Sequence, residues 1–199
     1  MANIQETEIT TKGIQKVLNK YTPERAIAEY VWNGFDADAS YVDLSFSENE
    51  LNTIDKIIIK DNGIGIDSTQ LNEKFKKFLE SSKGLKSTDG HKLKGKNGYG
   101  RLTFFKLASN AKWNTCYSDG KQKFKYSISI TVENLKRYES SEPTESLENT
   151  GTEVILNNVS VGKASKNFIN DVKKYLNEGL KTRKNKKESD KYIVTRRNK

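Results

Sequence analysis

The chain has 199 residues, a hydrophobic content of 34% and a formal net charge of +9. This length suits one domain, because single domains commonly run from about 100 to 200 residues. No apolar run approaches the roughly 20 residues that a membrane-spanning helix needs, and Met1 to Thr11 lacks the basic and then apolar layout of a signal peptide. The composition therefore excludes a transmembrane protein and predicts a soluble cytoplasmic protein without a membrane partner.

The positive charge is concentrated in two short segments. Residues 74–101 and residues 181–199 each hold nine Lys or Arg against two Asp or Glu, and the remainder is acidic overall. Two basic segments on an acidic body predict an anionic ligand near one and an anionic partner, such as nucleic acid, near the other. We expect a domain over residues 1–180, followed by a basic tail or linker. The single cysteine, Cys116, cannot form an internal disulfide and is expected to be buried in a strand.

Apolar periodicity predicts mostly helices, with two strands, in the first part of the chain. Thr22 is a suitable N-cap and Pro23 a suitable first residue for the second helix. The expected elements are helices over Gly13–Tyr21, Pro23–Asp36 and from about Ser68, and strands over Tyr41–Phe46 and Ile54–Lys60.

The rest of the chain is expected to hold more strands than helices. Ser118-Asp119-Gly120 is typical of a hairpin turn between two of the strands. The expected elements are a loop over Ser81–Asn97, a buried helix over Tyr99–Ala108, strands over Ala111–Tyr117, Lys123–Val132 and Gly151–Leu156, and an amphipathic helix over Phe168–Leu180. Helices and strands thus alternate irregularly, as in an α/β (α+β) domain.

Three polar residues share one face of the second helix. Glu29, Asn33 and Asp36 stand at positions i, i+4 and i+7, beside the apolar stripe of this helix. A carboxylate can orient and deprotonate a water, and an amide oxygen can bind Mg²⁺. The alternative is an ordinary solvated helix face.

A carboxylate and two glycines follow the most apolar strand. In Asp61-Asn62-Gly63-Ile64-Gly65, the carboxylate of Asp61 stands at the end of the strand, and the glycines allow a ligand to approach the main chain. Such a carboxylate can accept a hydrogen bond from an exocyclic amine. The alternative is an ordinary turn.

A glycine-rich segment precedes the expected buried helix. The sequence from Gly95 to Arg101 reads Gly-Lys-Asn-Gly-Tyr-Gly-Arg, and free main-chain N–H groups at a helix start favour phosphate. It lacks the G-x-x-x-x-G-K-[ST] pattern of a P-loop, and no strand precedes it as in a Rossmann fingerprint.

In this order, the motifs resemble those of the GHKL (Bergerat-fold) ATPase superfamily, in its ATPase branch with MutL, MORC, gyrase B and heat-shock chaperone proteins. Arg25–Ala37 resembles the N box E-x-x-x-N-x-x-D-A, and Asp61–Gly65 matches the D-x-G-x-G box. Gly95–Gly100 is similar to the glycine box at the end of the ATP lid, and Asn149–Val154 to the late G-T strand motif. The resemblance covers roughly Ile14 to Leu156.

This resemblance implies a two-layer sandwich, with a mixed, mostly antiparallel sheet and helices on one face. It implies ATP and Mg²⁺ as ligands, with ATP binding that closes the lid and promotes the association of two copies, and slow ATP hydrolysis that resets this change. Glu29 would be the general base and Asn33 the Mg²⁺ ligand. The implied ATP-binding residues are Asn33, Asp36, Asp61, Gly63, Gly65, Ser82, Lys83, Gly95, Gly98, Tyr99, Gly100, Arg101 and Thr152.

The resemblance also suggests what each group of these residues does. Asp36 would support the adenine side and Asp61 would bind the adenine amine, with Thr152 close by. Either Ser82 or Lys83 would contact phosphate. The glycines from position 95 onwards, together with Arg101, would close over the triphosphate.

Several cellular roles are compatible with this prediction. The basic lid and tail fit a DNA-associated protein of repair or defence, and a chaperone is the other role within the class. A nucleotide-sensing module without turnover is an alternative, and a phosphotransferase resembling the histidine kinases is a weaker one, because the only histidine, His91, stands in the expected lid. The branch normally continues into a second domain, so we expect an amino-terminal portion of a longer protein with weak activity in isolation.

Overall fold

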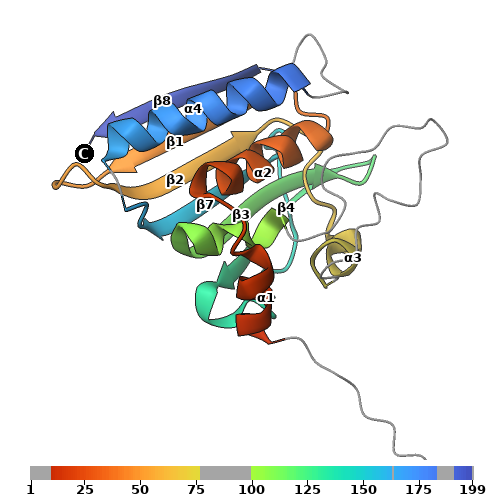
Figure 1. Cartoon of the computed structure of the whole chain (residues 1–199). Helices are drawn as coiled ribbons and strands as arrows, with labels where there is room; N and C mark the ends of the chain where they lie inside the picture. Colours follow the sequence, from red (N-terminus) through yellow and green to blue (C-terminus); the bar gives the residue numbers. More distant parts are fainter. Residues whose placement is uncertain (1–9, 77–99, 163, 183–190, 199) are drawn as a thin grey trace, which may run out of the picture.

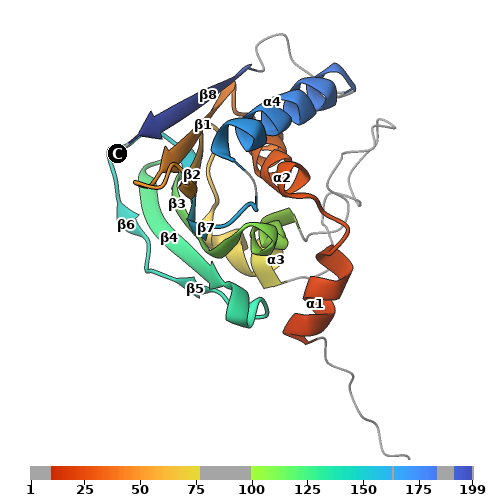
Figure 2. The ribbon, with the colours of Figure 1, turned by 60° about the vertical axis from the view of Figure 1, so that its left-hand side comes forward.

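A mixed sheet and a layer of helices on one of its faces make up the fold (Figures 1 and 2). The computed structural model describes residues 10–76, 100–162, 164–182 and 191–198. The helices are α1 Thr11–Leu18, α2 Pro23–Asp36, α3 Leu71–Lys76 and α4 Ser165–Thr182, with 3₁₀ turns η1 Ser68–Gln70, η3 Gly100–Lys106 and η4 Val132–Asn134. The strands are β1 Tyr41–Glu48, β2 Ile54–Asp61, β3 Ala108–Ser118, β4 Lys123–Thr131, β5 Glu139–Ser140, β6 Thr144–Glu145, β7 Gly151–Val159 and β8 Lys191–Asn198.

The sheet has eight strands in the order β5-β4-β3-β7-β2-β1-β8, with β6 also beside β4. All neighbouring strands are antiparallel except β1 and β8, which run parallel. This arrangement confirms the expected two-layer sandwich with a mixed, mostly antiparallel sheet.

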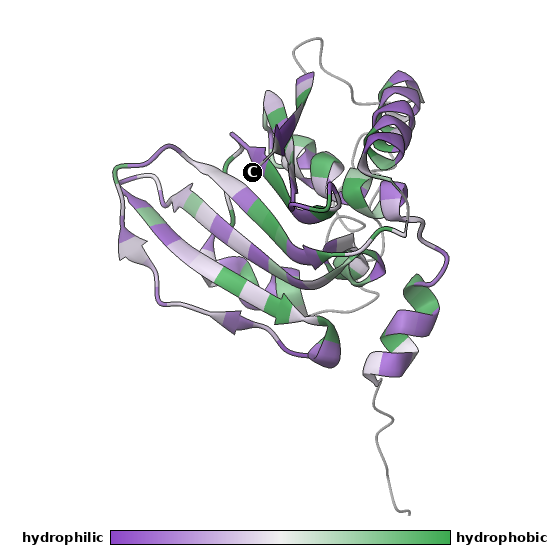
Figure 3. Ribbon diagram, turned by 90° about the vertical axis from the view of Figure 1, so that its left-hand side faces the viewer, coloured by the Kyte–Doolittle hydropathy of each residue, from purple (hydrophilic) through white to green (hydrophobic). Residues whose placement is uncertain are grey.

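The strands have one apolar face, as their alternating hydropathy shows (Figure 3). In β7, Thr152, Val154 and Leu156 are buried toward the helices, while the residues between them lie on the opposite face. The helices of the described residues cover only the first face (Figure 2). The opposite face is therefore the open face of the sheet.

The second helix, α2, packs across the middle of the sheet. Its N-cap is formed as expected, because the Thr22 hydroxyl accepts a hydrogen bond from Arg25 N over 3.3 Å and Pro23 begins the helix. At Gly34, an added Cβ would lie 3.0 Å from Asp61 Cβ and 3.1 Å from Val42 Cγ2. The absence of a side chain at Gly34 thus brings the polar end of α2 directly onto the end of β2.

The structure differs from the predicted elements at three places. The buried helix expected over Tyr99–Ala108 is instead the shorter 3₁₀ helix η3. It ends at Lys106, because the chain already enters β3 at Ala108. The helix expected from Ser68 begins as the 3₁₀ turn η1 before it becomes α3. Residues 191–198, expected in a tail or linker, pair along their whole length with β1 as strand β8. The expected loop Ser81–Asn97 lies outside the described residues.

The division into a domain over residues 1–180 and a basic segment over residues 181–199 stays a prediction. Within the described residues, no helix combines the length and the hydropathy that crossing a membrane requires.

Candidate functional site

The polar face of α2 lies against the start of η3. Glu29 is mostly buried, with 20% of its side chain exposed, while Asn33 is exposed. A Cβ added to Gly100 would lie 3.1 Å from Glu29 Oε2 and 3.8 Å from Asn33 Nδ2. Asp36 lies one turn further along the helix, at its carboxyl end. The structure thus brings the expected general base, the expected Mg²⁺ ligand and Gly100 together.

The carboxylate of Asp61 is held by the main chain at the end of β2. Its Oδ1 accepts hydrogen bonds from Gly63 N over 2.9 Å and from Thr152 N over 3.2 Å. Its Oδ2 has no hydrogen-bond partner among the residues that the structure describes. Burial raises the pKa of Asp61 above its ordinary value, and the two N–H donors oppose this rise. One oxygen is therefore fixed by the protein and the other remains available to a ligand.

Gly63 and Gly65 are required by close main-chain contacts. A Cβ at Gly63 would lie 2.4 Å from Ala37 O at the end of α2, and one at Gly65 would lie 2.1 Å from Cys116 O in β3. Gly65 also has φ +76°, where side chains are unfavourable. These glycines hold the turn after β2 between α2 and β3, beside Asp61.

Thr115 in β3 is a polar member of this cluster that the sequence analysis did not select. Its Oγ1 accepts a hydrogen bond from Ile66 N over 2.9 Å, and lies 3.1 Å from the hydroxyl of Thr152 and 3.2 Å from Gly151 O. Thr115 is buried and directly opposite Thr152 in the β3–β7 pair. It connects the glycine turn to the strand that carries Thr152.

The asparagine within the Asp61–Gly65 motif has a structural role. Asn62 Oδ1 accepts hydrogen bonds from the main-chain N–H groups of Ser40 and Tyr41, and its Nδ2 donates to the Ser40 hydroxyl. Asn62 therefore ties the turn after β2 to the start of β1.

The guanidinium of Arg101 is buried between η3 and α3. Its Nη2 donates to Phe75 O over 2.8 Å, and its Cζ lies 5.5 Å from the centre of the Phe75 ring. Burial lowers the pKa of Arg101 to about 10. The expected contact of Arg101 with a triphosphate stays a prediction. The expected site residues Ser82, Lys83, Gly95, Gly98 and Tyr99 lie outside the described residues.

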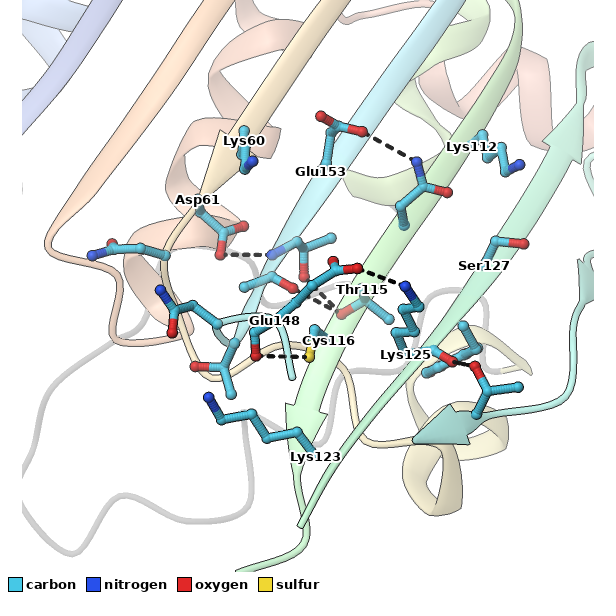
Figure 4. Close-up of a pocket in the computed structure, with 18 of the residues that line it drawn as sticks. Lys60, Asp61, Lys112, Thr115, Cys116, Lys123, Lys125, Ser127, Glu148 and Glu153 are labelled. Carbon is cyan, nitrogen blue, oxygen red and sulfur yellow. Dashed lines mark hydrogen bonds and ion pairs between the residues drawn. The ribbon is translucent and has the colours of Figure 1, made fainter. Parts of the chain in front are cut away.

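A hollow of about 1280 Å³ lies on the open face of the sheet (Figure 4). Lys60, Lys125, Glu148 and Glu153 are among the charged residues that line it. Lys125 pairs with Glu148 over 2.6 Å, and Asn114 donates to Glu153 over 3.1 Å. Asp61, Thr115 and Thr152 also line this hollow, whereas Glu29 and Asn33 do not. Its lining mixes both signs of charge.

Cys116 belongs to the same part of the sheet. It is a free cysteine with 5% of its surface exposed, and its thiol lies 3.6 Å from Glu148 O. This confirms the expected buried position in a strand.

A helix with an acid and an amide on its polar face, packed on a sheet beside a strand-end carboxylate, is the arrangement of the nucleotide-binding domains of the GHKL class. The family model described as "Histidine kinase-, DNA gyrase B-, and HSP90-like ATPase" matches residues 21–161. The chain belongs to this family, which confirms the resemblance found in its motifs.

One curated relative and two solved structures describe this similarity further. The putative type II restriction enzyme HgiDII of Herpetosiphon aurantiacus is 30% identical in an alignment of 161 residues that covers 74% of this chain and 25% of that protein. The N-terminal domain of a DNA repair protein superposes with a TM-score of 0.60 at 16% identity, covering 93% of this chain and 51% of that one. The MutL ATPase domain of Aquifex aeolicus complexed with ADP superposes with a TM-score of 0.54 at 16% identity, covering 88% of this chain and 60% of that one.

The two structural similarities, at these identities, establish the fold. The chain spans a quarter of the restriction enzyme and between half and two thirds of the two solved chains. Membership of an ATPase family supports ATP binding.

Proposed function

We propose that the chain binds ATP with Mg²⁺ between α2 and the end of β2, and hydrolyses it slowly to ADP and phosphate. The observation that carries this proposal is the geometry of Asp61. Its Oδ1 is held by Gly63 N and Thr152 N, so its Oδ2 is oriented and available to accept a hydrogen bond from an exocyclic amine. Family membership supports adenine as the base that carries this amine.

The Mg²⁺ site is proposed at Asn33. The described residues contain no group of three His, Cys, Asp or Glu side chains that would hold a metal by themselves. This fits Mg²⁺, which keeps several waters and is commonly held by substrate phosphates with one or two protein oxygens. The exposed amide of Asn33 would supply such an oxygen, and the ion would neutralise charge on the phosphates.

Glu29 is proposed as the general base. Its carboxylate lies beside Asn33 and against Gly100, where it would reach a water next to the terminal phosphate of a bound ATP. The carboxylate takes the proton of this water as the oxygen attacks phosphorus, and the bond to the ADP oxygen breaks. The other residues of the site are proposed in the roles that the resemblance gives them. They are Asp36, Gly63, Gly65, Ser82, Lys83, Gly95, Gly98, Tyr99, Gly100, Arg101 and Thr152.

The proposed output is a conformational switch. ATP binding would close the expected lid and favour the association of two copies, and hydrolysis would reverse both. A DNA-associated role in repair or defence is favoured over a chaperone role by the names of two proteins similar to this chain, a restriction enzyme and a DNA repair protein. The basic segments 74–101 and 181–199 would contact the nucleic acid.

Calorimetric titration with a non-hydrolysable ATP analogue and Mg²⁺ tests binding, using the native chain and the variants Asp61→Asn and Asn33→Ala. We expect binding to be lost in Asp61→Asn and to lose its Mg²⁺ dependence in Asn33→Ala. Glu29→Ala should then keep binding and lose turnover. A folded native chain that binds no analogue would contradict the proposal, and binding with unchanged function in Glu29→Ala would favour a nucleotide sensor without turnover.

A further inference from the structure

The hydroxyl of Tyr30 connects α2 to the main chain of η3. Tyr30 follows Glu29 directly, and only 3% of its surface is exposed. Its hydroxyl donates to Arg101 O over 2.8 Å and accepts from Phe104 N over 3.2 Å. Burial raises the pKa of Tyr30, so the hydroxyl stays protonated and keeps both interactions at neutral pH.

A second side chain makes a similar connection one turn earlier in α2. Thr103 is fully buried, and its hydroxyl lies 2.7 Å from Gly100 O and 3.3 Å from Ala26 O. The Thr103 hydroxyl has one proton to share between Gly100 O in η3 and the more distant Ala26 O in α2, so Tyr30 makes the firmer connection between the two elements. The hydrogen bonds hold main-chain atoms of η3, so they fix the position of its backbone.

The position of this backbone matters because Gly100 lies directly against Glu29. A Cβ at Gly100 would come within 3.1 Å of Glu29 Oε2. A shift of η3 away from α2 would therefore change the space in front of the carboxylate. By contrast, Asp61 and its partners belong to β2, the turn after it, β3 and β7, and none of them contacts Tyr30 or Thr103 through a hydrogen bond within the described residues.

We propose that Tyr30 is a positioning residue that, together with Thr103, holds the main chain at Gly100 at the distance from Glu29 that hydrolysis requires. This inference rests on the proposed function and adds two residues outside its nucleotide-binding set. Tyr30 acts through η3 and does not touch the reacting atoms. Its loss should lower the rate of the chemical step and leave the affinity for the base unchanged, because misplacement by about 1 Å can cost as much as about a hundredfold in rate.

The test compares Tyr30→Phe with Tyr126→Phe in the same chain. Tyr126 is also buried, with 5% exposed, but its hydroxyl has no hydrogen-bond partner in the described part of the chain. Both changes remove one buried hydroxyl, and only Tyr30→Phe leaves Phe104 N–H without its acceptor. We expect kcat for ATP to fall about tenfold or more in Tyr30→Phe, with the Kd for ADP within about twofold of the native value. In Tyr126→Phe, both quantities should stay at their native values.

The Thr103 variants provide a second measurement. Thr103→Val should lower kcat in the same way, and Thr103→Ser, which keeps the hydroxyl, should restore it. A structural role alone would lower the melting temperature and change kcat and Kd only in proportion to the folded fraction. Native kcat in folded Tyr30→Phe and Thr103→Val would overturn the inference.

Amide hydrogen exchange separates this inference from the proposed hydrolysis. A native chain that binds ADP but does not turn over ATP contradicts the hydrolysis, and exchange then tests only whether Tyr30 holds the main chain of η3. Faster exchange over residues 100–104 in Tyr30→Phe, with native exchange in Tyr126→Phe, supports the positioning role. Equal exchange over these residues in the two variants overturns it.

Discussion

The guanidinium of Arg101 donates a hydrogen bond to the main-chain oxygen of Phe75, with 2.8 Å between Nη2 and O. These two residues lie on either side of the expected loop Ser81–Asn97, so their contact joins α3 to η3. Arg101 also lies over the Phe75 ring, and its pKa, lowered to about 10 by burial, keeps it charged at neutral pH. One side chain therefore connects the described elements that precede and follow this loop.

Replacement of Arg101 should destabilise the protein. Arg101→Met keeps most of the apolar stem and removes the charged donor, so we expect the free energy of unfolding to fall by about 1.5 to 3 kcal/mol. Urea unfolding followed by tryptophan fluorescence measures this change. Arg137→Met is the matched control, because Arg137 is exposed and makes no side-chain hydrogen bond or ion pair within the described residues. Equal stability of the two variants would contradict the role assigned to the Phe75 contact.

Asp61→Asn should remove nucleotide binding without weakening the fold. The asparagine oxygen can replace Oδ1 as the acceptor of the N–H groups of Gly63 and Thr152. The asparagine Nδ2 then places a donor where Oδ2 would accept a hydrogen bond from the adenine amine. Asp61→Ala is the contrasting variant, because it leaves both N–H groups without their acceptor. We expect Asp61→Ala to lose about 1 to 3 kcal/mol of stability relative to Asp61→Asn in urea unfolding.

The pH dependence of stability gives an independent test of Asp61. Its folded-state pKa is raised by burial above the ordinary value of 3.8, so its ionisation costs stability. The stability that the protonated Asp61 contributes to the native protein is fully present below pH 3.8, and it is lost as the pH rises through the folded-state pKa. Asp61→Asn does not ionise at this position. Its stability relative to the native protein should therefore rise as the pH increases from about 3.5 to 7, and a constant difference would contradict the raised pKa.

Local sequence signals predicted correctly which helix and strand carry the expected site residues. The cap at Thr22, the start of α2 at Pro23 and the shared face of Glu29 and Asn33 all follow from helix geometry and match the structure. The position of Asp61 at the end of β2 follows from the apolar run that precedes it.

Contacts that depend on strand order could not be predicted in this way. Thr115 is part of the site only because β3 lies beside β7, which places it opposite Thr152. Thr115 stands two residues from the buried Trp113 and from Tyr117, so it lies on the same face of β3 as they do and faces the helices. This spacing does not reveal which residue of the adjacent strand lies opposite Thr115. Strand β8 was also missed, because its basic residues indicate a solvated segment and its pairing with β1 joins residues far apart in sequence.

Gly65→Ala should destabilise the turn that carries the Asp61 motif. The new Cβ would lie 2.1 Å from Cys116 O, at φ +76°. Gly120 also has a positive φ, +94°, but a Cβ there would meet nothing within 4 Å, so Gly120→Ala measures the cost of the backbone conformation alone. We expect about 1 to 2 kcal/mol for Gly120→Ala and a clearly larger loss for Gly65→Ala, measured by urea unfolding. Similar losses would show that the turn relaxes away from β3.

Strand β8 should depend on the ion pair that joins Arg196 to Glu48 in β1. Glu48 is 1% exposed, and its Oε2 accepts from Nε and Nη2 of Arg196 over 2.7 and 2.6 Å. Arg196→Met leaves this buried carboxylate without its cation and should cost about 3 kcal/mol near pH 7 by urea unfolding, whereas adding Glu48→Gln should recover part of the loss. Arg196 lowers the pKa of Glu48, so the stabilisation is present above the ordinary value of 4.5 and is lost as the pH falls through the lowered pKa. The difference between the native protein and Arg196→Met should therefore shrink below about pH 4.5, and a difference that is the same at pH 7 and pH 3 would show that the charge of Glu48 does not hold β8 in the sheet.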